Sequence, residues 1–135
     1  GAAVQGLEGS TIPSVRKKTR GVEISDGHLV PLTVEPSDFG LEGPEEPQLP
    51  MFGPPEEGYG TSDNPALVQA AGAATRAVLA GETGPARNAV LLASAVVLKS
   101  SGRCRTLAEG VDAAAKAIDD GVAREVVEHL KGLIP

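Results

Sequence analysis

The sequence predicts an α/β protein with a few strands, an edge hairpin and about four C-terminal helices. Three observations support this fold class. A short apolar run opens the chain, an Asp26-Gly27 pair separates two strand-like stretches, and helical periodicity dominates after residue 61. The 135 residues suffice for one domain with one core.

The opening residues 1–6, Gly-Ala-Ala-Val-Gln-Gly, predict a buried strand followed by a turn. A fully buried strand needs neighbours on both edges and helices on both faces. The rest of the sequence contains too few strands to provide them. We therefore expect these residues to belong to the C-terminal portion of a larger α/β protein. The loop up to about Ser10 follows the strand's carboxyl end, where ligands bind in open α/β sheets.

Residues 11–20 are predicted to form a polar, basic loop, and a β-hairpin follows at residues 22–24 and 29–34. Asp26 and Gly27 suit the backbone of its tight turn. Pro31 has no N–H to donate to a second neighbour, so the second strand should lie at a sheet edge.

Residues 42–60 are rich in Pro, Gly and Glu, and the repeated prolines exclude a helix there. The segment is longer than most loops within compact domains. We expect an irregular, exposed excursion with a linker-like structural role. Docking of a partner is an alternative that rests on composition alone.

Four helices are predicted after this segment. The first covers about residues 64–80 and ends at Gly81, a residue suited to helix termini. The second covers residues 85–100, with Thr83 as a possible cap and Pro85 in the first turn. Between residues 86 and 98 this helix has only three polar residues, Arg87, Asn88 and Ser94. We therefore expect most sides of the helix to be buried and only these three side chains to contact water.

The third helix starts at Thr106, which forms a capping box with Glu109. The last covers about residues 122–131. Helical spacing predicts one apolar face on each of these two helices. The inward residues are expected to be Leu107, Val111, Ala114 and Ile118 on the third helix, and Val122, Val126, Val127 and Leu130 on the last.

Composition limits the functions that the chain can have. The net charge of −6 argues against the whole chain acting as a nucleic-acid clamp. No apolar run reaches the roughly 20 residues of a membrane helix, and no signal-peptide pattern opens the chain. The single cysteine, Cys104, cannot form an internal disulfide, which fits a reducing cytoplasm. We expect a cytoplasmic protein with no membrane partner.

Four motifs, in order, resemble one known family. Residues 81–92 contain Gly-acid-x-Gly-Pro-x-Arg-Asn before an Ala/Val/Leu helix. Residues 34–41 resemble "L-x-P-E-D-F-G-L", Asn64 precedes a helix as in "E-N-A", and residues 117–123 resemble "A-I-D-S-G-x-A". Together they resemble the C-terminal region of the anthranilate phosphoribosyltransferase family. Pyrimidine nucleoside phosphorylases share the overall architecture, but the motifs of residues 34–41 and 81–92 favour the anthranilate phosphoribosyltransferases.

The resemblance implies a function for the longer protein. Members of the family transfer phosphoribose from phosphoribosyl pyrophosphate to the aromatic amine anthranilate, with Mg²⁺, in tryptophan biosynthesis. The implied fold is a phosphoribosyltransferase-type (nucleoside phosphorylase/phosphoribosyltransferase-like) α/β domain, in a homodimer joined by N-terminal helical domains. The family's "G-T-G-G-D" phosphate loop is absent from residues 1–135. We therefore expect one partial domain (1–41 strands and hairpin, 42–60 irregular, 61–135 helical) that lacks the helical domain and the phosphate-loop half and is inactive alone.

The family's "V-V-H-G-x-D-G-L-D-E" segment corresponds to residues 3–12. Gln5 stands at the histidine, so Gln5 and Gly6 are substrate-side candidates. Without a gap, Glu8 matches the first Asp and Thr11-Ile12 replace the acidic pair. With a short deletion, Glu8 matches the Asp of that pair and Gly9 replaces its Glu. Either way at most one carboxylate remains, so Glu8 is the Mg²⁺ candidate and metal binding by this chain is in doubt. A solvated loop carboxylate is the alternative.

Further departures suggest a divergent paralogue. Asn88 stands where the family usually has Asp, and Ala93 where it often has Asn. Nucleic-acid binding has been associated with that paralogous branch.

Four basic residues make phosphate or nucleic-acid contact a candidate role: Arg16, Lys17, Lys18 and Arg20. No aromatic residue interleaves with them, so a base-stacking platform is not predicted. A solvated basic loop is the alternative interpretation. Catalytic residues stay unknown, since neither Ser10 nor Ser14 lies in a nucleophile-elbow context and the two histidines lack metal-ligand spacing.

Overall fold

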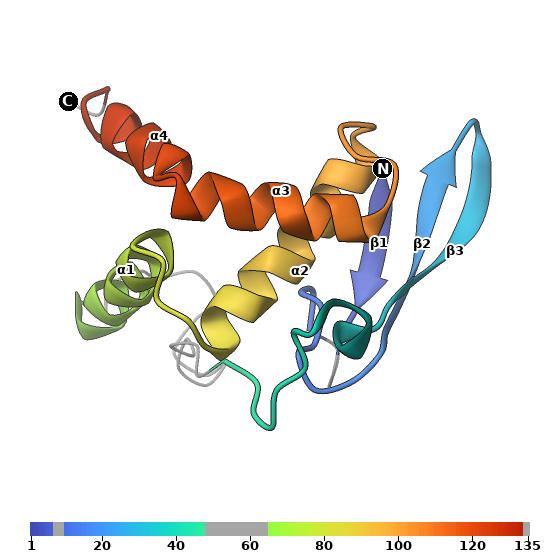
Figure 1. The fold of residues 1–135 in the computed structure, drawn as a ribbon, viewed down its shortest axis with the longest axis horizontal. Coiled ribbons are helices and arrows are strands. Elements are labelled where there is room, and N and C mark those ends of the chain that lie inside the picture. Colours follow the sequence, from blue (N-terminus) through green and yellow to red (C-terminus); the bar gives the residue numbers. More distant parts are fainter. Residues whose placement is uncertain (7–9, 48–64, 134–135) are drawn as a thin grey trace.

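The structure, a computed structural model, describes residues 1–6, 10–47 and 65–133. Three strands form one antiparallel sheet in the order β1 (Ala2–Gln5), β2 (Thr19–Ser25) and β3 (His28–Val34). Four helices follow: α1 (Pro65–Leu79), α2 (Pro85–Ser100), α3 (Leu107–Asp119) and α4 (Val122–Lys131). Figure 1 shows the sheet at one end of the molecule and α1 at the other. The predicted fold class, with its few strands, edge hairpin and four helices, is confirmed.

The hairpin is confirmed in its turn and its edge. Asp26 and Gly27 have φ angles of 50° and 78°, as a two-residue turn of this hand requires. Pro31 lies on β3, the outer strand, opposite Val22. The predicted extent of the basic loop is wrong at its end, because Thr19 and Arg20 belong to β2. Pairing of β2 with both β1 and β3 extends the strand beyond the limit set by local pattern.

The prediction of a fully buried first strand is wrong. Ala2, Ala3 and Gln5 are exposed, and Val4 is half-buried. Among the described residues, β1 pairs only with β2, and helix packing covers one face of the sheet. An apolar strand without a second neighbour stays accessible to water.

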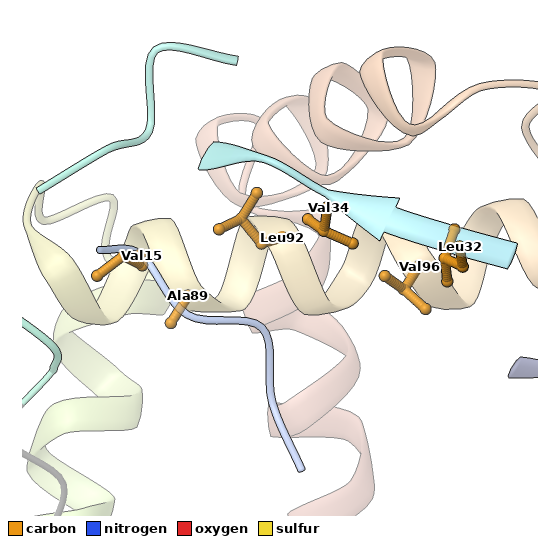
Figure 2. Close-up of a cluster of buried hydrophobic side chains, with 6 residues drawn as sticks. All are labelled: Val15, Leu32, Val34, Ala89, Leu92 and Val96. Carbon is orange, nitrogen blue, oxygen red and sulfur yellow. The ribbon is translucent and has the colours of Figure 1, made fainter. Parts of the chain in front are cut away.

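The main core lies between the sheet and α2. Its buried side chains come from the segment before β2, from β3 and from α2, as Figure 2 shows. They are Val15, Leu32, Val34, Ala89, Leu92 and Val96. Alternate residues of β3 point inward, as a half-covered sheet requires.

A second core lies where the helices meet. Val78 at the end of α1 packs with Leu91 of α2 and with Ala114 and Ile118 of α3. Helix α3 crosses α2 closely, since a Cβ atom added to Gly110 would lie 2.8 Å from the Ala95 Cα. The apolar face predicted for α3 is therefore confirmed, with Leu107 partly buried against the main core.

The start and end of α2 match the prediction, but two details do not. Gly84, with a φ angle of 140°, is the N-cap residue, and no side chain forms a capping hydrogen bond there. The prediction that Thr83 caps the helix is therefore wrong. Arg87 is buried rather than exposed, because it turns to a carboxylate on α3. Val90 and Val97, in contrast, are 40% and 65% exposed, so burial of α2 is incomplete.

Helix α3 begins as predicted, because the Thr106 Oγ1 accepts from the Glu109 N–H at 3.1 Å. The inward face predicted for α4 is wrong. Val122, Val126 and Leu130 are about half exposed, and Val127 is half-buried. In the described structure α4 reaches the core only through Ala123. No helix among the described residues has the length and apolar character to cross a membrane.

Candidate functional site

One substrate-side candidate, Gln5, lies beside one phosphate-side candidate, Arg20. Gln5, at the end of β1, pairs in register with Arg20 on β2. Val4 packs toward the α2 core, so Gln5 and Arg20 lie on the opposite face of the sheet. Both residues are exposed. Gln5 from the predicted strand and Arg20 from the predicted basic loop thus meet at one polar end of the sheet.

The backbone before the basic residues is fixed by Glu46. The Ser14 hydroxyl donates to the Glu46 Oε1, and the Val15 N–H donates to the Glu46 Oε2 at 3.2 Å. The Ser14 Oγ also accepts from the N–H groups of Arg16 and Lys17, each at 3.0 Å. One hydroxyl and one carboxylate therefore hold three consecutive peptide groups.

Two further bonds close the arrangement. The Ser14 N–H donates to the Thr19 Oγ1 at 2.9 Å, and the Gly43 N–H donates to the Val15 carbonyl at 2.9 Å. Ser14 and Thr19 are only 3% and 1% exposed. Buried polar groups of this kind are costly to leave unpaired, so the network defines one backbone conformation.

The basic side chains project from this fixed backbone into solvent. We call Arg16, Lys17, Lys18 and Arg20 the basic patch, and all four residues are exposed. Lys18 contacts Glu35 at 3.3 Å. Within the described ranges no ion pair engages Arg16, Lys17 or Arg20. A surplus of positive charge therefore gathers at this end of a chain whose net charge is −6.

Gly6 marks a tight return of the chain beside the patch. Its N–H donates to the Ser10 carbonyl at 2.7 Å, and a Cβ atom at this position would lie 2.2 Å from the Ile12 carbonyl oxygen. Only glycine fits such an approach. Glu8, the metal candidate, lies outside the described residues. Among the residues described, no group of three or more His, Cys, Asp and Glu side chains is placed to hold a metal.

The sequence motifs contact one another across the fold. The Asn88 Nδ2 donates to the Leu41 carbonyl at 3.1 Å, which joins the second helix to the end of the 34–41 motif. The Arg87 Nη2 donates to both oxygens of Asp119, at 2.8 and 3.0 Å, which joins it to the 117–123 motif. Arg87, Asn88 and Asp119 therefore belong to the scaffold, whereas the 34–41 motif also reaches the basic patch through the Lys18–Glu35 ion pair.

Sequence reasoning missed the supporting residues of the patch. The sequence context excludes Ser14 as a nucleophile, but a serine two residues before Arg16 can also accept nearby backbone N–H groups. Glu46 had no local signal, because 31 and 32 residues separate it from its partners.

Comparison with known proteins gives consistent relatives, although no family model matches. The anthranilate phosphoribosyltransferase of Symbiobacterium thermophilum is 37% identical over 128 residues, which are 95% of this chain and 33% of that protein. That of Trichlorobacter lovleyi is 35% identical over 98% of this chain and 34% of its own length. The chain thus spans about one third of the length of the curated relatives it matches.

Solved structures agree with the sequence relatives. The anthranilate phosphoribosyltransferase of Thermus thermophilus is 28% identical, with a TM-score of 0.62 over 96% of this chain and 34% of that one. The Saccharomyces cerevisiae enzyme in complex with 4-fluoroanthranilate is 27% identical, with a TM-score of 0.65 over 93% and 33% of the two chains. A variant of the yeast enzyme with Mg bound, 24% identical, has the same fold at a TM-score of 0.65.

Proposed function

Because the chain belongs to the anthranilate phosphoribosyltransferase family, of whose members it spans about one third, we propose that the whole protein is a phosphoribosyltransferase. It transfers phosphoribose from phosphoribosyl pyrophosphate to an aromatic amine. The observation that carries this proposal is the 37% identity to an enzyme of that name along 95% of the chain. Residues 1–135 alone are expected to be inactive, since they lack the family's phosphate loop.

Phosphoribosyl transfer requires that the two substrates are positioned and that the negative charge of the departing pyrophosphate is stabilised. Displacement at the sugar carbon develops positive charge there, and pyrophosphate departs with negative charge. In this proposal Arg16, Lys17 and Arg20 contact phosphate oxygens, because they are exposed cations on a fixed backbone. Gln5 and Gly6 then lie on the substrate side, since Gln5 is paired with Arg20.

Two relatives of known structure indicate the acceptor and the metal of the whole protein. A yeast relative binds 4-fluoroanthranilate, which supports an aromatic amine as acceptor. A yeast variant with Mg bound supports Mg²⁺ as a ligand of the whole protein. Among the described residues no group of three or more His, Cys, Asp and Glu side chains is placed to hold the ion, and the candidate Glu8 lies outside them. We also propose that the whole protein is a homodimer and is located in the cytoplasm.

The direct test uses the full-length product of the gene with anthranilate, phosphoribosyl pyrophosphate and Mg²⁺. We expect loss of anthranilate fluorescence with the full-length protein and none with residues 1–135. Changing Arg16, Lys17 and Arg20 together to Gln should raise the KM for phosphoribosyl pyrophosphate. A matched triple change of Arg103, Arg105 and Arg124 to Gln should leave it unchanged. Absence of turnover with a correctly folded full-length protein would exclude the transferase function.

A second candidate is a divergent, non-anthranilate paralogue that binds nucleic acid through the basic patch. The observation that favours it is the exposure of three cations without carboxylate partners in the described structure. Each contact to single-stranded phosphate contributes about 0.7 to the slope of log K against log salt concentration. The Arg16, Lys17 and Arg20 to Gln variant should therefore lower that slope by roughly 2. An unchanged slope, measured with a labelled oligonucleotide by fluorescence anisotropy, would remove this candidate.

A further inference from the structure

The Glu46 carboxylate is bound as an anion by a site that the chain itself builds. Its Oε1 accepts from the Ser14 hydroxyl, and its Oε2 accepts from the Val15 N–H at 3.2 Å. Ser14 and Val15 are buried, and Glu46 is half-buried, so the site opens to solvent on the side from which Glu46 enters. Within the described part of the chain Glu46 forms no ion pair. Two uncharged donors therefore hold both oxygens of one anion.

The Ser14 hydroxyl is fixed as a donor toward this site. A serine hydroxyl offers one proton and two lone pairs. The N–H groups of Arg16 and Lys17 bond to the Ser14 Oγ, each at 3.0 Å, and so use both lone pairs. The proton is left for an acceptor at the position of the Glu46 carboxylate. The hydroxyl can therefore meet another anion there without rearrangement, and such bonds to a charged acceptor are strong.

The site keeps most of its contacts when the Glu46 carboxylate leaves. The Ser14 N–H donates to the Thr19 Oγ1, and the Gly43 N–H donates to the Val15 carbonyl, each at 2.9 Å. Neither of these bonds involves a carboxylate. The Gly43 contact also ties the segment that carries Glu46 to Val15. The Glu46 side chain can therefore turn away while the backbone around the site stays in place.

The positive charge beside the site exceeds what one carboxylate balances. Arg16, Lys17 and Arg20 follow Ser14 closely in the sequence and are exposed. None of the three has a carboxylate partner among the residues described. Glu46 brings one negative charge, whereas a terminal phosphate group carries about −1.5 to −2 at pH 7 and three acceptor oxygens. Two of those oxygens can meet the fixed donors, and the third can face a cation of the basic patch.

We propose that Ser14 and Val15, together with the basic patch, form a phosphate site that the Glu46 carboxylate occupies in this structure. The ligand is a small molecule with a terminal phosphate group, such as inorganic phosphate or pyrophosphate. It displaces the Glu46 carboxylate into solvent and accepts from the Ser14 hydroxyl and the Val15 N–H. The carboxylate thus competes with phosphate and lowers its apparent affinity. The inference rests on the phosphate-contact role of the basic patch in the proposed function, but not on phosphoribosyl transfer.

The test is a titration of residues 1–135 with inorganic phosphate at constant ionic strength, followed by nuclear magnetic resonance at the Val15 amide. Glu46→Ala opens the site, so its dissociation constant for phosphate should be about tenfold lower than that of the wild type. Phosphate should also slow the hydrogen exchange of the Val15 amide in this variant, because it replaces the lost acceptor. Glu45→Ala is the matched control, since it removes the same charge from an exposed neighbour and should bind phosphate like the wild type.

Two further variants separate the site from a general attraction of phosphate to the basic patch. Glu46→Gln keeps the size of the side chain without its charge, so its dissociation constant should lie between those of the wild type and Glu46→Ala. Ser14→Ala, added to Glu46→Ala, should weaken phosphate binding about tenfold, because a hydrogen bond to a charged group is lost. Circular dichroism checks that each variant is folded, and the order of the Glu46 variants decides the matter if the double variant unfolds.

Equal dissociation constants for the wild type, Glu46→Ala and Glu45→Ala, or no binding by any of them, would overturn the inference. So would phosphate binding that leaves the exchange of the Val15 amide unchanged, since the ion would then contact only basic side chains. Phosphate binding as expected, without transferase turnover by the full-length protein, would count against the proposed function and leave the site intact. Turnover without phosphate binding at this site would count against the inference alone.

Discussion

Arg87 shows how a single residue connects distant motifs. Its Nη2 holds both oxygens of Asp119 across 32 residues of sequence, and its side chain is 10% exposed. The Nη1 atom is buried and has no hydrogen-bond partner in the described structure. The guanidinium therefore depends on one carboxylate, and loss of that carboxylate leaves a buried cation.

Asp119→Ala should lower the free energy of unfolding by about 2 kcal/mol, because a buried charged donor loses its partner. The neighbouring Asp120→Ala is the control. Asp120 pairs with Lys116 on the surface, so its removal should cost much less. Urea unfolding of the two variants measures the difference, and equal losses would contradict the role assigned to Arg87.

The Lys116 pair also has a defined pH dependence. A hydrogen bond and the charge of Asp120 raise the pKa of Lys116 above its ordinary value of 10.5. Its small contribution to stability is thus fully present at neutral pH and is lost as pH rises through the folded-state pKa. The Asp119–Asp120 comparison is therefore best made near pH 7.

Glu46 is the residue on which the basic patch depends. In Glu46→Ala the Val15 amide loses its acceptor, and we expect its hydrogen exchange to quicken by about tenfold, as for loss of one hydrogen bond to a charged group. Glu45→Ala, an exposed neighbour, should leave exchange at Val15 unchanged. Hydrogen-exchange rates of the Val15 amide, measured by nuclear magnetic resonance in both variants, test this prediction. An equal rate in both variants would show that other contacts fix this backbone.

At the scale of elements, the α2–α3 crossing depends on Gly110. A Cβ atom there would lie 2.8 Å from the Ala95 Cα and 3.0 Å from its carbonyl oxygen, and neither backbone atom can turn aside. Gly110→Ala should therefore destabilise the protein by about 1–3 kcal/mol, despite a helix-propensity gain of about 1 kcal/mol.

Gly72→Ala in α1 is the matched control with the opposite expected sign. Its Cβ atom would meet only the flexible Arg76 guanidinium, at 3.3 Å. The propensity gain should then dominate and raise the midpoint of thermal unfolding. If both alanine variants shifted the midpoint upward, the close crossing would be disproved.

At the scale of the whole molecule, exposed apolar surface and net charge act against each other. The chain carries a net charge of −6 at pH 7 and has a pI near 4.9. Mutual repulsion should keep it dispersed at neutral pH and fade as the pI is approached. We expect light scattering to show growing self-association from pH 7 toward pH 5. Val97→Glu should reduce it and Leu29→Glu should reduce it less, because only Val97 lines the apolar hollow between α2, α3 and the start of α4. An equal effect of both changes would mean that charge alone controls association.

The sequence by itself determined the elements whose signals are local. Asp26-Gly27 fixes the hairpin turn through its own backbone geometry, Pro85 suits the first turn of α2, and Thr106 with Glu109 starts α3. Each of these signals acts within about four residues, which is why they could be predicted. The sequence motifs also indicated the family to which the relatives belong, and those relatives support the proposed function.

Only the tertiary structure decided which faces are covered and which distant groups meet. Val126 and Leu130 have the spacing of a buried helix face, but the described chain offers them no partner. The Ser14–Glu46 and Asn88–Leu41 contacts join residues 32 and 47 positions apart, and no local pattern encodes such pairs. Spacing gives a helix an apolar face, whereas burial of that face depends on what packs against it.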